Sequence, residues 1–287
     1  MFIEAAGTQV HYVEHGPGTG APTAVFLHGF PVDHRIMTGP FEPVFARRPG
    51  WRRLYLDLPG MGATVAPPEV ASTDAVFDVV RAAIDALVPG PYVAVGESYG
   101  GYLARGLAAA EPDRVQGIGL VCPMIVAEHA ERDAPPYRVL VRDPELVAQV
   151  GAEVLDADDV GVIQTPPTWQ RTLEEVLPGL TAADAEATAR IRADWTGTFP
   201  LEPRPYQRPT LFLLGRQDAS TGYADAWRIL EHYPRASFAV LDRAGHNLQI
   251  EQPALFEALV DEWLDRVEEA GTGVGAGPAQ AAALPAR

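Results

Sequence analysis

The chain has 287 residues and a formal net charge of −16, from 22 basic and 38 acidic side chains. This length allows a sizeable buried core without a metal or a disulfide, and the negative charge repels phosphate backbones and anionic membranes, which argues against nucleic-acid and membrane partners. A single cysteine, Cys122, excludes an intramolecular disulfide and a metal site built on a cysteine cluster.

Neither a targeting signal nor a membrane span is expected. The opening stretch, MFIEAAGTQVHYVEHG, has no basic residue and no continuous apolar core of signal-peptide length. The longest apolar run, residues 115–127, has 13 residues, whereas a membrane-spanning helix needs roughly 20. We therefore expect a cytoplasmic protein, monomeric or homodimeric, that acts on a small molecule.

Strand-like and helix-like segments alternate along the first part of the chain. Apolar runs that end in glycine or proline predict buried strands, and apolar stripes of helical period predict the crossover helices. The predicted order is strands at 9–15, 22–30 and 51–62, a helix at 72–88 with Ser72, Thr73 or Asp74 as N-cap, a strand at 91–98, a helix at 99–112 and a strand at 115–123. This alternation predicts an α/β fold with a mainly parallel central sheet and helices on both faces.

The alternation stops between Pro123 and Pro205, where the composition is mostly helical, prolines interrupt the pattern and no convincing strand appears. It resumes with a strand at 209–218, a helix at 223–233, a strand at 237–246 and a helix at 252–269. We therefore expect an α/β core of residues 1–122 and 206–270 and a helical lid (cap) inserted at 123–205. Residues 271–287, rich in glycine, alanine and proline, are expected to be a disordered tail.

A serine in a glycine-dense turn lies between the predicted strand at 91–98 and the helix that follows. The stretch Gly96-Glu97-Ser98-Tyr99-Gly100 matches G-x-S-x-G in the strand-to-helix context of a nucleophile elbow. Glycines beside the serine remove the collisions that such a sharp turn causes, and the new helix directs its first N–H groups at charge forming beside Ser98. The pattern alone also fits a purely structural turn.

Two further strand ends supply partners for this serine. A serine nucleophile needs a base, and the base needs a group that orients it. His246 lies in a glycine-containing loop after the last predicted strand, and Asp218 follows the strand before it. Because ligands bind outside the carboxyl ends of parallel strands, we expect Ser98, Asp218 and His246 to meet at one sheet edge.

These motifs, in this order, resemble those of the α/β-hydrolase superfamily, in its group of lidded, cofactor-free serine hydrolases. The similarity extends over residues 8–269 and rests on four motifs: His28-Gly29-Phe30-Pro31, the serine elbow, Gly215-Arg216-Gln217-Asp218 and Gly245-His246. The resemblance implies that Ser98 is the nucleophile, His246 the base and Asp218 the group that orients it. It also implies an oxyanion hole formed by the backbone N–H groups of Phe30 and Tyr99.

Other residues near these motifs have competing interpretations. His34 is a candidate pocket residue, or it opens a helix with Asp33 as N-cap; Trp169 and Trp195 are pocket wall or lid core. His28 is expected to tie loops together, and Glu97 to be a buried, hydrogen-bonded acid.

The predicted reaction follows from the nucleophile. A serine at the elbow excludes the alkyl-enzyme mechanism of relatives that use aspartate there. We expect a carboxylic-ester hydrolase that acts, without cofactor or metal, on a small, largely apolar substrate. A carbon–carbon bond hydrolase, an aminopeptidase-like hydrolase of the same fold and a low-turnover ligand receptor remain alternatives.

The acidic surface also bears on the charge of the substrate. It favours neutral or cationic substrates unless Arg35, Arg138 or Arg204 lines the entrance to the pocket.

Overall fold

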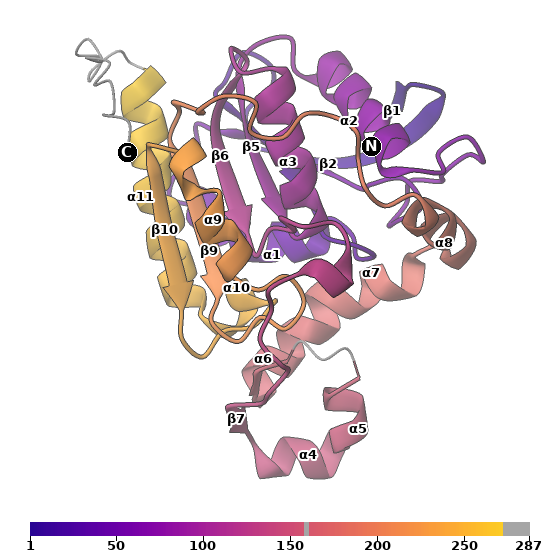
Figure 1. Ribbon diagram of the computed structural model, residues 1–287, viewed down its shortest axis with the longest axis vertical. Helices are drawn as coiled ribbons and strands as arrows, with labels where there is room; N and C mark the ends of the chain where they lie inside the picture. The colour runs from indigo at the N-terminus through magenta and orange to yellow at the C-terminus, as the bar shows by residue number, and fades with distance from the viewer. Residues whose placement is uncertain (158–160, 272–287) are drawn as a thin grey trace, which may run out of the picture.

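The computed structural model describes residues 1–157 and 161–271. Its main sheet has eight strands in the order β1-β2-β4-β3-β5-β6-β9-β10 (Figure 1). Neighbours from β4 to β10 are parallel, and β1 and β2 add an antiparallel edge, so the expected α/β fold with a mainly parallel sheet is confirmed. The strands are β1 (Phe2–Ala5), β2 (Thr8–His15), β3 (Thr23–Leu27), β4 (Arg52–Leu56), β5 (Tyr92–Glu97), β6 (Val115–Val121), β9 (Thr210–Gly215) and β10 (Ala236–Leu241).

Helices cover both faces of this sheet because its central strands are apolar on both sides. In β3, for example, Val25 and Leu27 pack into the cluster on one face, and Ala24 and Phe26 pack into the cluster on the other. One face carries α2 (Thr73–Leu87), α3 (Tyr99–Ala110) and α9 (Ala224–Arg228), and the other carries α1 (Arg35–Phe45) and α11 (Pro253–Gly271).

The helices of residues 123–205, which we call the insert, lie beyond the carboxyl ends of the parallel strands, whereas its last residues run back along α2 and α3, where Phe199 stacks on Phe77 and Glu202 pairs with Arg105. In Figure 1 the arrowheads of β6, β9 and β10 point toward α6 and α7. The described part of the insert contains a 3-10 turn (His129–Glu131), β7 (Val141–Arg142), α4 (Pro144–Val150), α5 (Ala152–Leu155), β8 (Ile163–Gln164), α6 (Pro166–Arg171), a π-helical turn (Thr172–Val176), α7 (Leu177–Ala182) and α8 (Ala185–Ala193).

The sequence patterns missed the shortest elements. No strand is expected in the insert, yet β7 and β8 pair in parallel over two residues each, too few for a period of two to be visible. The edge strand β1 was also missed, because it is only four residues long and half exposed. The 3-10 turn Leu230–His232 ends the helical pattern expected through residue 233.

The last helix, α11, extends slightly beyond the expected core. Gly271, expected to begin the tail, is the last residue of α11, and the rest of the expected tail, residues 272–287, lies outside the described residues. Among the described helices, none has both the length and the apolar character that a bilayer crossing requires.

Candidate active site

Ser98, Asp218 and His246 follow β5, β9 and β10 and therefore meet at the same edge of the sheet. Ser98 and His246 border a cavity of about 470 Å³ that lies between this edge and the insert. Asp218 lies behind the histidine and is fully buried.

The turn at Ser98 has the backbone conformation of a sharp strand-to-helix junction. Ser98 has φ 51° and ψ −114° and is the N-cap of α3, a conformation that costs energy for any residue except glycine. A Cβ on Gly96 would overlap the carbonyl of Gly100, and a Cβ on Gly100 would overlap the carbonyl of Leu27. The two glycines therefore allow the turn to close against its own helix and against β3.

Asp218 holds His246 through a direct hydrogen bond. The Nδ1–H group of His246 donates to Oδ2 of Asp218 at 3.0 Å. The carboxylate also accepts from the backbone N–H groups of Ser220 and Thr221, and from the Thr221 hydroxyl at 2.8 Å. Burial alone would raise the pKa of Asp218, but His246 and the Thr221 bonds lower it, so this acid stays ionised.

The other acids near in sequence are engaged elsewhere. Asp225 accepts the backbone N–H of Asp133 and pairs with Arg228, and Asp242 accepts from the side chain of Gln217. Among these aspartates, Asp218 is therefore the one that forms a hydrogen bond with Nδ1 of His246.

The other ring nitrogen of His246 faces an acid rather than the serine. Nε2 lies 3.4 Å from Oε1 of Glu97, and among the described residues no hydrogen bond joins the Ser98 hydroxyl to this imidazole. Burial alone would lower the pKa of His246, but Asp218 and Glu97 together raise it to about 9.

Phe30 and Tyr99 both line the cavity beside Ser98. Tyr99 is the first residue of α3, so its N–H has no partner within the helix, and Phe30 follows Gly29 in the loop after β3. Across the described residues, neither N–H donates to another protein group. Both are therefore free to donate to an oxyanion, the role that the resemblance predicts for them.

Of the three candidate pocket residues, only Trp195 borders this cavity. It stacks on Tyr99 with ring centroids 4.6 Å apart and meets Phe30 edge-on at 4.8 Å. Trp169 instead lines a second cavity of about 290 Å³ between the insert and residues 247–251.

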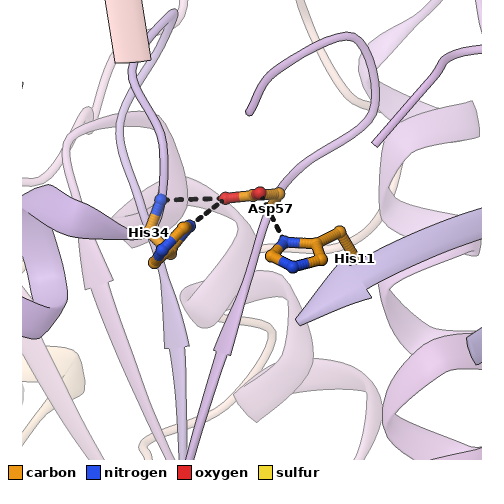
Figure 2. Close-up of side chains that lie close together, drawn as sticks. All are labelled: His11, His34 and Asp57. Carbon is orange, nitrogen blue, oxygen red and sulfur yellow. Dashed lines mark hydrogen bonds and ion pairs between the residues drawn. The ribbon is translucent and has the colours of Figure 1, made fainter. Parts of the chain in front are cut away.

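His34 does not border the cavity at Ser98, because its ring is turned toward Asp57 (Figure 2). Its Nδ1 and that of His11 each lie 2.8 Å from an oxygen of Asp57, on opposite sides of the carboxylate. Asp57 also accepts the backbone N–H groups of His34 and Ala63. His34 is the N-cap residue of α1, one position later than the sequence pattern suggests.

Two clusters in the described chain have the residue types of a metal site. In the cluster of His11, His34 and Asp57, four hydrogen bonds already occupy the carboxylate, so the arrangement orders the loop after β4 without a metal. The second cluster is Cys122, Asp218 and His246. Burial raises the pKa of the Cys122 thiol, which donates to the carbonyl of Gly245, so this sulfur is a poor metal ligand.

His28 is fully buried and ties two loops together, as its position suggests. Its Nε2 accepts the N–H of Leu58, and its Nδ1 then donates to the carbonyl of Gly29. It is therefore held away from catalysis.

Sequence patterns missed two cationic residues of the cavity, Arg132 and Arg192. Arg132 donates to the backbone carbonyls of Val126, Ala127 and Ser220. The Arg192 guanidinium lies 5.0 Å from the ring centroid of Phe30. Within the described chain neither arginine forms an ion pair with an acid. Neither arginine lies in a recognisable sequence motif, so their common place at the cavity becomes visible only in the folded structure.

A third missed residue, Glu251, connects the insert to the loop of His246. One carboxylate oxygen accepts the N–H groups of Val162 and Ile163 in the insert, and the other accepts the N–H of Gly245. The acid thus joins the histidine loop and the segment at β8.

Comparison with known proteins agrees with this architecture. The chain matches the alpha/beta hydrolase family over residues 24–259. It is 29% identical over 255 residues to the 2-succinyl-6-hydroxy-2,4-cyclohexadiene-1-carboxylate synthase of Salmonella paratyphi B, covering 85% of this chain and 94% of the relative. A crystal structure of an alpha/beta superfamily hydrolase from Oenococcus oeni superposes with a TM-score of 0.84 at 27% identity, covering 93% of this chain and 99% of the other.

A more distant structure shares the fold. The thermophilic esterase from Thermogutta terrifontis has a TM-score of 0.69 at 22% identity, over 93% of this chain and 98% of its own. The chain therefore belongs to the alpha/beta hydrolase family. It is an enzyme of that superfamily, with a hydrolase-like architecture.

Proposed function

We propose that the protein is a serine hydrolase that cleaves a carboxylic ester or a similar acyl bond of a small molecule. One observation carries this proposal: a serine at a positive-φ turn shares a cavity with a histidine that is hydrogen-bonded to a buried, ionised aspartate. Ser98 attacks the carbonyl carbon, and His246 takes its proton and later returns it to the leaving group. Asp218 stabilises the resulting imidazolium, and the N–H groups of Phe30 and Tyr99 bind the oxyanion.

We further propose that the insert, residues 123–205, is the lid of this site. Its residues Ala127, Val176, Leu180 and Trp195 supply much of the apolar lining of the cavity. A lid of this kind excludes water and selects the substrate.

The charge of the cavity supports a substrate with a negative group. None of Arg35, Arg138 and Arg204 lines it, but Arg132 and Arg192 do. Burial lowers the pKa of Arg132, and Arg192 acts in the same direction, whereas Asp218, Glu128 and Asp225 oppose it. Because neither cavity arginine forms a direct ion pair with an acid of the described chain, an anionic group of the substrate can supply that partner. The expected preference for neutral or cationic substrates therefore gives way to one for an ester that carries a carboxylate or a comparable anion.

A second candidate is acid–base catalysis without an acyl-enzyme. It is favoured by the contact of His246 Nε2 with Glu97 instead of Ser98, and the Salmonella relative is named a synthase rather than an esterase. In this case His246 transfers a proton to or from the substrate directly, and Ser98 only binds the substrate.

Covalent labelling and turnover of nitrophenyl esters test the proposal. We expect the wild type and Ser220→Ala to acquire one fluorophosphonate adduct on the Ser98 peptide, and Ser98→Ala to acquire none; Ser220 lines the same cavity and so serves as the matched control. The Ser98→Ala variant should lose ester turnover by about 10⁴-fold or more. Equal turnover by wild type and Ser98→Ala contradicts a nucleophilic role for Ser98. Full labelling without steady-state turnover supports the ligand-receptor alternative.

A further inference from the structure

The carboxyl group of Glu97 is a buried acid that the proposed mechanism leaves without a task. Glu97 is the last residue of β5, next to Ser98, and only 2% of it is exposed. Its Oε1 lies 3.4 Å from Nε2 of His246, and its Oε2 accepts no hydrogen bond of normal geometry among the described residues, although it lies against the backbone of Gly29. Buried carboxyl oxygens are normally hydrogen-bonded, so this unpartnered oxygen requires an explanation.

The loop after β3, which contains Gly29 and Phe30, leaves room for this carboxyl group. A Cβ on Gly29 would overlap Oε2 of Glu97 and lie 3.1 Å from the Cβ of Ser98. The glycine therefore allows the acid to lie against the loop after β3 and to border the cavity together with Ser98 and His246. The carboxyl group reaches the same ring nitrogen that must accept the serine proton.

The two acids nearest to His246 favour a proton on its Nε2. Asp218 raises the pKa of His246 from the loop after β9, whereas Arg132, in the insert, opposes it; Glu128 and Arg192 border the cavity without a direct contact to the ring. Burial raises the pKa of Glu97 to about 7; His246 and the backbone N–H of Gly29 oppose this rise, and Asp218 adds to it. Near neutral pH the imidazole of His246 is therefore protonated on both nitrogens, with Nδ1–H facing Asp218 and Nε2–H facing Glu97.

We propose that Glu97 is a positioning residue that holds the proton on Nε2 of His246 and so sets the pH range in which His246 acts as a base. The inference rests on the proposed function, because Nε2 of His246 must be free of its proton only if His246 acts as the base for Ser98. In the resting site the Nε2–H group faces the Glu97 carboxylate. Loss of that proton to solvent leaves a neutral imidazole, whose lone pair accepts the Ser98 proton as the serine oxygen bonds to the acyl carbon. The carboxylate then stabilises the imidazolium that this transfer creates.

The sign of the pH effect follows from the charge. A carboxylate beside Nε2 favours the protonated imidazole, so its removal lowers the pKa of His246. Since the neutral form is active, the acid limb of kcat/KM should move to lower pH in Glu97→Gln. Its high-pH plateau should fall, because the imidazolium of the transition state loses a counter-charge.

NMR titration of the histidine rings tests the inference independently of turnover. The chain has seven histidines, and the His246 resonance is assigned by its loss in His246→Asn. We expect Glu97→Gln to lower the pKa of His246 by about one unit or more, with the acid limb of kcat/KM moving by the same amount. Glu128→Gln, the matched control at the cavity rim, should leave the His246 titration in place.

Two outcomes overturn the inference. One is an unchanged His246 titration in a folded Glu97→Gln protein. The other is a rate that falls equally at every pH, as a purely structural role predicts. If Glu97→Gln does not fold, Glu97→Asp replaces it: the shorter side chain withdraws the charge from Nε2, so the His246 pKa should fall part of the way, and no fall contradicts the inference. Failure of the proposed function appears instead as an absence of Ser98 labelling and turnover, which leaves the titration readable.

Discussion

At the scale of single residues, Arg192 is expected to decide between neutral and anionic substrates. It lies over the rings of Phe30 and Trp195 at the cavity and has no acidic partner in the described chain. Hydrogen bonds to charged groups are worth about 1.5–3 kcal/mol, so we expect Arg192→Gln to lower kcat/KM for the nitrophenyl monoester of succinic acid by about tenfold or more.

The matched control for this change is Arg190→Gln. Arg190 lies on the same helix, α8, but reaches the carbonyls of Ala66 and Pro67 and does not border the cavity. Nitrophenyl acetate, which is neutral, should be hydrolysed at similar rates by all three proteins. An equal loss for both esters in Arg192→Gln would show that the residue supports the structure of the site rather than binding an anion.

The sequence allowed prediction of the residues whose place depends on short motifs. Ser98, Asp218 and His246 each stand at the end of a predicted strand segment, and the common direction of those strands brings them to one edge. The contact of Glu97 with His246 joins residues 149 positions apart (246 − 97), and its geometry depends on loop conformations that no local pattern encodes. The same holds for Arg132 and Arg192, and for His34, whose ring turns to Asp57 because that buried carboxylate can accept its N–H.

At the scale of elements, the turn between β5 and α3 is expected to tolerate no side chain at Gly100. A Cβ there would overlap the carbonyl of Leu27 in β3, so Gly100→Ala must push α3 away from the sheet. We expect a loss of about 2 kcal/mol or more in the free energy of unfolding, in the range of other overpacked core positions. Gly50→Ala is the control, because nothing lies within 4 Å of its Cβ position. Urea denaturation measures both variants, and equal midpoints would contradict the tight contact.

The predictability of the elements depends on their length. Helices such as α2 show several turns of apolar stripe, and Ser72, one of its three expected N-caps, does accept the N–H of Ala75. Strands of two residues, such as β7 and β8, are too short to show an alternation of apolar and polar residues. They are recognised only by the hydrogen bonds between them in the folded chain.

At the scale of the whole molecule, the net charge of −16 opposes the approach of an anionic substrate such as the one that we propose. Salt screens exposed charges over about 8 Å at physiological ionic strength and screens partly buried ones less. Raising the salt concentration should therefore increase kcat/KM for the succinate monoester and leave that for nitrophenyl acetate nearly unchanged. A selective fall for the anionic ester would mean that the local field of the arginines outweighs the surface charge.

The carboxylate of Glu251 has a consequence for protein engineering. It accepts hydrogen bonds from the backbone N–H groups of Val162 and Ile163 and from that of Gly245, next to His246. A chimera that takes its insert, residues 123–205, from a homologue must reproduce the two N–H donors of residues 162 and 163, or the buried Glu251 loses those hydrogen bonds next to His246. Such a graft would bind its new ligand and yet turn over slowly, and redesigning position 251 together with the grafted segment should restore the rate.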